Sequence, residues 1–121
     1  VELIDSLPQE ELLQHLRSSL ALLSASTEEG FDYPVLEAKA EGTPTLISDI
    51  PVHREFHLDS SLFFPVDDDG GALADHVIAC LQDRDLWVQL SQAGFELAQQ
   101  LSLDAQLASI KDQFQHLCRR N

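Results

Sequence analysis

Short apolar segments alternate with amphipathic ones along much of the chain. The apolar runs at 1–4, 20–25, 44–49 and 62–66 are rich in Leu, Ile, Val and Phe, and polar or turn-forming residues follow each of them. Runs of this length are typical of strands that are buried on both faces. The pattern therefore predicts about four strands, with helical segments between them.

Helical patterns fill the intervals between the apolar runs and occupy the C-terminal part of the chain. Proline, which is favoured in the first helical turn, is present as Pro8 and Pro34 in two of these segments. Gly42 lies just past the second segment, where a left-handed glycine commonly ends a helix. Phe95 and Phe114 lie on apolar stripes and are expected to pack in a core. Helices are therefore predicted near residues 8–18, 34–41, from 70 onward, 84–100 and 103–119.

The alternation of strands and helices predicts an α/β fold. We expect a Rossmann-like parallel sheet of about four strands, with helices on both faces and a C-terminal helical segment. The length of 121 residues allows one domain or part of one. Ligands bind beyond the carboxyl ends of the strands in open parallel sheets. The loops at 26–33, 48–61 and 66–71 are therefore the candidate positions for a binding site.

Composition narrows the classes of function. The chain has 7 Lys and Arg against 21 Asp and Glu, a formal net charge of −14 at pH 7, and such a surface disfavours nucleic acid as a partner. Cys80 and Cys118 lie 38 positions apart, so no disulfide framework or CxxC metal site is predicted. No apolar run approaches the ~20 residues that span a bilayer, and we expect a soluble, cytoplasmic protein. The chain lacks Met and begins with Val1, so we expect it to be a piece of a longer protein.

The loop after the second predicted strand is the richest in candidate residues. It contains Glu29, Gly30 and Phe31, and Pro34 then begins a helix whose first N–H groups lack partners within the helix. Such a helix start attracts anions, and a glycine lets an anionic group approach the main chain. Glu37 follows one turn into the helix, so Glu29 and Glu37 can border one pocket. In a chain with 21 acidic residues, two unrelated surface carboxylates also give this spacing.

Residues 29–44, EGFDYPVLEAKAEGTP, closely resemble the E-G-F-x-x-P-x-x-E-A-x-A-x-G-x-P signature of retaining, nucleotide-sugar-dependent glycosyltransferases of the GT-B fold. In that family, typified by bacterial mannosyl- and glucosyltransferases, the two glutamates form the E-x7-E motif. Residues 1–26, 48–55 and 64–68 resemble the flanking segments. The resemblance implies that 1–121 is the C-terminal part of the donor-binding domain, an incomplete half of a GT-B enzyme whose acceptor domain is absent from this chain.

The same resemblance implies a function, which is the transfer of a hexose such as mannose from a nucleoside diphosphate sugar to a glycan or lipid acceptor. Glu29 is implied as the catalytic residue, hydrogen-bonded to hydroxyls of the transferred sugar. Gly30 and Phe31 would offer main-chain N–H groups to the sugar and diphosphate, and Glu37 would bind the ribose. A carboxylate suits vicinal hydroxyls because it accepts with two oxygens. No cofactor is implied.

This chain departs from the family pattern at two places. Many members carry Gly where Asp32 stands, and we expect Asp32 to cap the following helix. The Arg and Lys pair that holds the diphosphate in the family has no counterpart among the seven Lys and Arg. We therefore expect the chain alone to be inactive without the missing N-terminal part of the enzyme. The lost pair and the acidic charge keep a second hypothesis open, a degenerate transferase-like domain that acts as a protein-interaction or scaffold module.

Three further features bear on partners and metals. The apolar strand edge near 1–4 predicts self-association, because unpaired edges invite pairing. His53 and His57 are four positions apart, but Pro51 makes a regular zinc-binding helix doubtful and no third ligand is evident. The acidic triplet at 67–69 is interpreted as a solvated turn that caps the next helix. The sequence therefore predicts no metal site.

Overall fold

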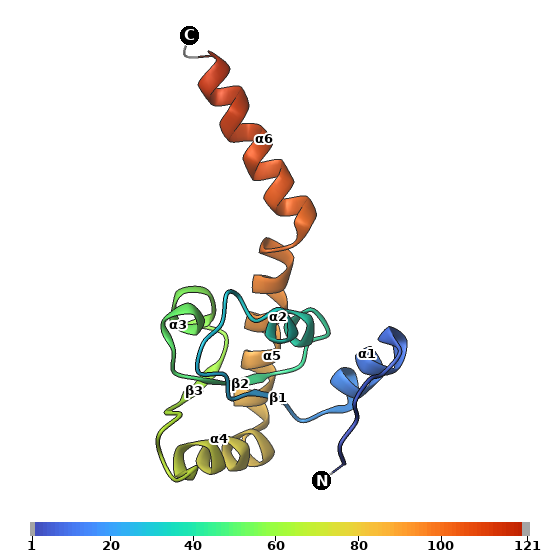
Figure 1. Ribbon diagram of the computed structural model, residues 1–121, viewed down its shortest axis with the longest axis vertical. Coiled ribbons are helices and arrows are strands. Elements are labelled where there is room, and N and C mark those ends of the chain that lie inside the picture. Colours follow the sequence, from blue (N-terminus) through green and yellow to red (C-terminus); the bar gives the residue numbers. More distant parts are fainter. Residues whose placement is uncertain (1, 120–121) are drawn as a thin grey trace.

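The computed structural model describes residues 2–119 and shows an α/β fold (Figure 1). Its sheet has three parallel strands in the order β1-β2-β3. In chain order the elements are α1 (Gln9–Ser18), β1 (Leu22–Ser24), α2 (Tyr33–Ala40), β2 (Thr45–Ser48), α3 (Pro51–His57), β3 (Leu62–Phe64), α4 (Gly71–Gln82), α5 (Arg84–Gln100) and α6 (Leu103–Arg119).

The central strand β2 is the most deeply buried part of the sheet. Its register places Leu46 beside Leu23 of β1 and Leu62 of β3. All four residues of β2 are buried, whereas Leu23 is 49% exposed. The expectation that the run at 20–25 is buried on both faces is therefore wrong. Within residues 2–119, β1 is an edge strand with a neighbour on one side only, and its Leu23 side chain reaches solvent.

Helices cover both faces of the sheet, as the sequence predicted. Figure 1 shows α2 and α3 on one side of the strands and α4 on the other. The core joins Leu46 and Phe64 of the sheet to Cys80 of α4 and Leu90 of α5. Helix α5 also packs along α2. The carboxyl ends of the three strands therefore lie at one edge of a covered sheet, the edge where parallel folds bind ligands.

Two predicted elements differ from the structure. Residues 2–4 are exposed and form no strand, while Val1 lies outside the described residues, so residues 2–119 form three strands rather than about four. A short apolar segment becomes a strand only where another strand supplies its hydrogen bonds. The predicted loop at 48–61 contains α3, with Pro51 as its first residue. Proline starts a helix readily because the first turn needs no N–H from it.

The later helices match their predicted positions but not all of their predicted packing. Phe95 is 45% exposed and Phe114 is 65% exposed, so the expectation that both lie in a core is wrong. Figure 1 shows α6 extending away from the sheet, and among the described residues its contacts lie chiefly with α5. In the part of the chain that the structure describes, no helix has both the length and the apolar character needed to cross a membrane.

Candidate functional site

The β1–α2 loop (residues 25–32) carries the first group of predicted site residues at the carboxyl edge of the sheet. Glu29 is exposed, and Ser26 Oγ donates a hydrogen bond of 2.6 Å to Glu29 Oε1. A side chain added at Gly30 would meet nothing within 4 Å. Within residues 2–119, the main-chain N–H groups of Gly30 and Phe31 have no hydrogen-bond partner. The loop therefore contains one oriented carboxylate and two main-chain donors without a hydrogen-bond partner in the described residues, with open space beside Gly30.

The start of α2 contributes fewer free donors than the sequence led us to expect. Pro34 has no N–H, and the N–H of Val35 donates to the carbonyl of Asp32 at 3.1 Å. Pro34 and Val35 therefore supply no free N–H group at the start of α2.

The side chain of Phe31 anchors the loop rather than facing solvent. It is half-buried, with its ring 4.9 Å from that of Phe56 in an edge-to-face arrangement and 5.2 Å from that of Tyr33. Aromatic pairs at these distances and tilts attract one another beyond the area they bury. Phe31 thus fixes the loop through its ring while its main-chain N–H stays available.

Glu37 lies on α2 and is exposed. It lines a shallow hollow of about 240 Å³ between α2 and α5, together with Tyr33, Leu36 and Ala98. Glu29 does not line that hollow. The structure thus brings Glu29, Gly30 and Phe31 together in one loop and places Glu37 beside a separate hollow on the following helix.

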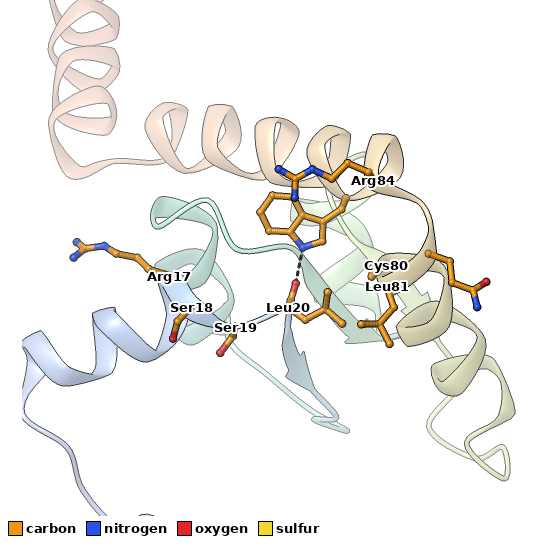
Figure 2. Close-up of a pocket in the computed structure, with 9 residues that line it drawn as sticks. Arg17, Ser18, Ser19, Leu20, Cys80, Leu81 and Arg84 are labelled. Atoms are coloured by element: carbon orange, nitrogen blue, oxygen red, sulfur yellow. Dashed lines mark hydrogen bonds between the residues drawn. The ribbon is translucent and has the colours of Figure 1, made fainter.

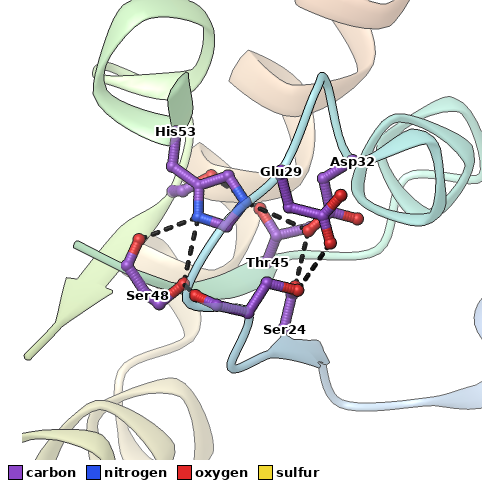
Figure 3. Close-up of polar contacts among 8 residues, drawn as sticks. Ser24, Glu29, Asp32, Thr45, Ser48 and His53 are labelled. Atoms are coloured by element: carbon purple, nitrogen blue, oxygen red, sulfur yellow. Dashed lines mark hydrogen bonds and ion pairs between the residues drawn. The ribbon is translucent and has the colours of Figure 1, made fainter. Parts of the chain in front are cut away.

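Asp32 behaves differently from the expectation that it caps α2. It is the first residue before the helix, but its side chain makes no capping hydrogen bond, and its backbone is left-handed with φ 63° and ψ 69°. Figure 3 shows the side chain turned toward the sheet. Asp32 Oδ2 accepts a hydrogen bond from Ser24 Oγ at 2.5 Å and lies 3.0 Å from His53 Nε2. The capping prediction is wrong because these buried donors compete for the carboxylate.

Sequence reasoning missed His53 as a partner of this loop. Its side chain on α3 is fully buried, and its second nitrogen, Nδ1, lies 2.8 Å from the carbonyl oxygen of Ser48. A carbonyl only accepts, so Nδ1 carries a proton and donates it. A further proton must lie between Nε2 and Asp32 Oδ2, and when Nε2 carries it the contact is a buried ion pair. The signal available in the sequence was the proline at position 51, which starts the helix that orients His53.

Two more buried titratable groups lie behind the loop. Lys39 on α2 is completely buried, and its amine donates to the carbonyl and the hydroxyl of Ser60 at 3.1 and 2.5 Å. Burial lowers the pKa of Lys39 to about 7. His57 is also completely buried, and within residues 2–119 its ring nitrogens have no hydrogen-bond partner. Its pKa falls to about 4, chiefly through burial and further through the positive charges of Lys39 and His53.

The two candidate metal clusters have other roles in the structure. His53 and His57 lie one turn apart on α3, and residues 2–119 contain no group of three or more His, Cys, Asp or Glu side chains placed to hold a metal ion. In the acidic triplet, Asp68 accepts from the N–H of Gly70 at 2.6 Å, and Asp69 accepts from the N–H of Gly71 at 3.0 Å. Asp68 also accepts from the N–H of Ala72 at 3.3 Å, so carboxylates of the triplet bond the first N–H groups of α4 as interpreted, although the residue at the N-cap position is Gly70.

A hollow of about 480 Å³ lies at the other end of the sheet, where β1 begins (Figure 2). Trp87 and Arg84 line it, with the guanidinium of Arg84 5.3 Å from the centre of the Trp87 ring. Trp87 Nε1 donates to the carbonyl of Leu20 at 2.8 Å, which ties α5 to the start of β1. This hollow is remote from the β1–α2 loop because the two lie at opposite ends of the same strand.

The sequence matches the family model described as "Glycosyl transferases group 1" over residues 1–97 of the 121. The chain belongs to this family. It is also similar to the O-antigen chain mannosyltransferase RfbU of Salmonella typhimurium (strain LT2), with 43% identity over 49 residues. That similarity covers 40% of this chain and 14% of the relative, so the chain spans only a small part of the length of the curated relative it matches.

The match to glycosyl transferases group 1 covers the whole sheet and the β1–α2 loop, and it ends within α5. Helix α6 lies beyond it. As a member of this family, the chain has the α/β architecture that its sequence predicted, here as a partial Rossmann-like domain with a small parallel sheet.

Proposed function

We propose that the chain is the C-terminal part of the donor-binding domain of a retaining glycosyltransferase of the GT-B fold. The complete enzyme transfers a hexose such as mannose from a nucleoside diphosphate sugar to a glycan or lipid acceptor in the cytoplasm. Membership of glycosyl transferases group 1 supports the reaction class, and the likeness to a protein named as a mannosyltransferase supports the sugar.

The observation that carries the proposal is the arrangement of the β1–α2 loop. Glu29, with one oxygen held by Ser26, has its carboxylate free to accept hydrogen bonds from sugar hydroxyls. The N–H groups of Gly30 and Phe31 in the same loop have no hydrogen-bond partner in the described residues, and main-chain donors of this kind suit phosphate oxygens. An oriented carboxylate next to main-chain donors is what a molecule with hydroxyls at one end and a diphosphate at the other requires.

In this proposal, Glu37 binds the ribose of the donor. Its exposed carboxylate lies on α2 beside the hollow that Tyr33 also lines, so a sugar ring there would find both an acceptor and an aromatic surface. In this proposal, the Arg and Lys pair that neutralises the diphosphate comes from sequence outside this chain. The acceptor domain comes from there as well. The chain alone is therefore expected to bind donor weakly and to transfer no sugar.

The test compares three single substitutions in the complete protein, with GDP-mannose and UDP-sugars as donors. We expect Glu37→Gln to raise the KM for the donor about tenfold or more, since a charge-assisted hydrogen bond is lost. We expect Glu29→Gln to lower kcat as well, because Glu29 contacts the transferred sugar. Glu28→Gln is the matched control, an exposed neighbour outside the motif, and should leave both constants within about twofold.

Two results would contradict the proposal. Unchanged kinetics in both Glu29→Gln and Glu37→Gln would favour the scaffold hypothesis, which the net charge of −14 supports. Calorimetry of the 121-residue chain with the same nucleotide sugars tests whether donor binding depends on the part of the enzyme outside this chain. Micromolar binding by this chain alone would show that the diphosphate needs no contacts beyond those present here.

A further inference from the structure

The β1–α2 loop is fixed to the body of the protein at both of its ends. At the beginning, the hydroxyl of Ser48 at the end of β2 donates to the carbonyl of Ser26 at 2.5 Å. At the other end, Asp32 Oδ2 receives Ser24 Oγ at 2.5 Å and lies 3.0 Å from His53 Nε2. The segment between these two points contains Glu29. Its position relative to the sheet therefore depends on two sets of buried or half-buried polar contacts.

His53 connects both sets. Its Nδ1 donates to the carbonyl of Ser48 at 2.8 Å, and its Nε2 meets Asp32, so one imidazole joins the end of β2 to the start of α2 (Figure 3). The side chains of His53 and Asp32 are 0% and 3% exposed. Water does not compete for these contacts, so each is stronger than an exposed contact of the same kind.

The backbone of Asp32 shows that the contact imposes a conformation. Asp32 is the only residue other than glycine with positive φ in the part of the chain that the structure describes. The left-handed region is uncommon outside glycine, Asp is among the residues that adopt it more often than most, and it persists where surrounding contacts require it. The bonds from Ser24 and His53 supply that requirement, and they set the direction in which the chain leaves Phe31 and enters α2.

We propose that Asp32 and His53 are positioning residues for the donor site. Their buried contact fixes the β1–α2 loop, and thereby fixes where the Glu29 carboxylate and the N–H groups of Gly30 and Phe31 meet the nucleoside diphosphate sugar. The inference rests on the proposed function. Both side chains are buried, so in this proposal they act through Glu29 and its neighbours in the loop rather than by contact with the donor.

The first test measures the loop directly in this chain. His53→Phe removes both ring nitrogens without changing residue 32, and Asp32→Gly removes the carboxylate while accepting the positive φ. We expect amide order parameters at Gly30 and Phe31 to fall from about 0.85 to below about 0.6 in both variants, with those of β2 unchanged. Asp32→Asn can place its amide nitrogen where Oδ2 lies and donate one N–H to Ser24 Oγ and the other to Nε2 of a neutral His53, so it should restore the rigid loop.

The matched control for this measurement is Asp49→Asn. Asp49 also pairs with a basic side chain, that of Arg54, but the pair is exposed and lies outside the β1–α2 loop. It should leave the order parameters of the loop unchanged. The inference is overturned if the loop stays rigid in His53→Phe and Asp32→Gly. Global unfolding of both variants also overturns it, because the pair would then support the fold rather than the loop.

The second test separates positioning from general destabilisation in the complete protein. His53→Phe should lower kcat/KM for the donor at least tenfold relative to the wild type. Added to Glu29→Gln, it should lower kcat/KM by less than about twofold relative to Glu29→Gln alone. Equal losses in both backgrounds would show that His53 acts through overall stability and would overturn the inference. If Glu29→Gln alone leaves the kinetics unchanged, the proposed function fails, while the order parameters still decide whether the pair holds the loop.

Discussion

The buried amine of Lys39 gives the most quantitative prediction. Lys39 is 0% exposed, its stem lies against Gly94 of α5, and its amine is bonded to Ser60. Burial lowers its pKa from 10.5 to about 7. A lysine that is buried without a carboxylate partner is easier to keep neutral than charged. Replacing it by Met keeps the length of the stem and removes the titration.

The sign of the effect follows from proton linkage. Between pH 7 and 10.5 the unfolded chain holds a proton on Lys39 and the folded chain does not, so unfolding takes up a proton. The free energy of unfolding of the wild type therefore rises with pH by about 1.4 kcal/mol per unit in this window through Lys39. Lys39→Met lacks this contribution. The difference in unfolding free energy, variant minus wild type, should fall by about 3 kcal/mol from pH 7.5 to pH 9.5.

Urea unfolding followed by circular dichroism at pH 7.5, 8.5 and 9.5 measures this difference. All other titrating groups are common to the two proteins and cancel in the subtraction. Lys111→Met on α6 is the control, because Lys111 is exposed and its removal should give a difference that does not vary with pH. Parallel pH profiles for wild type and Lys39→Met would refute the reasoning, since they would show that the amine keeps its proton in the folded protein.

Three other predictions concern the stability and association of the chain. The pKa of His57 is about 4, against an ordinary 6.5, so the free energy of unfolding should fall by roughly 3 kcal/mol as the pH is lowered from 6.5 to 4. In urea titrations, the free energy of unfolding of His57→Phe should vary less with pH over this range. Asp83 Oδ1 caps α5 by accepting from the N–H of Leu86 at 3.0 Å, so Asp83→Ala should lose about 1 kcal/mol in the same assay. Within residues 2–119, β1 pairs on one side only, so we expect the chain to self-associate through this edge. Light scattering should show the association, and Leu23→Lys should reduce it. A monomer throughout the micromolar range would contradict this prediction.

Local patterns were sufficient for most of the fold. The apolar run around Leu46 predicted the central strand because a fully buried strand is apolar on both faces. The apolar stripe predicted a helix near 84–100, and α5 lies there. The errors arose where an element depends on its neighbours. Residues 2–4 have the composition of a strand but no partner in the described structure, and Pro51 begins α3 although a proline usually interrupts a helix.

The site could be predicted only in part, for a related reason. The spacing of Glu29, Gly30 and Phe31 is local, and the sequence placed all three in one loop after β1. The contacts of Asp32 with His53 and of Lys39 with Ser60 each join residues 21 positions apart. Periodicity reports which face of an element a residue occupies, and it does not report which polar side chain on another element it meets. Such pairs become visible only when the crossover from α2 through β2 to α3 is known.

Asp32 shows why an acidic residue beside a proposed diphosphate site need not oppose the ligand. A carboxylate at the start of α2 would repel phosphate if it pointed outward with the free N–H groups of Gly30 and Phe31. Instead, its side chain is 3% exposed, and Oδ2 receives Ser24 and His53 on the side of the sheet. The carboxylate is therefore bonded on the side of the sheet and is not free at the start of α2. Asp32 thus adopts a left-handed backbone while its side chain also contacts Ser24 and His53.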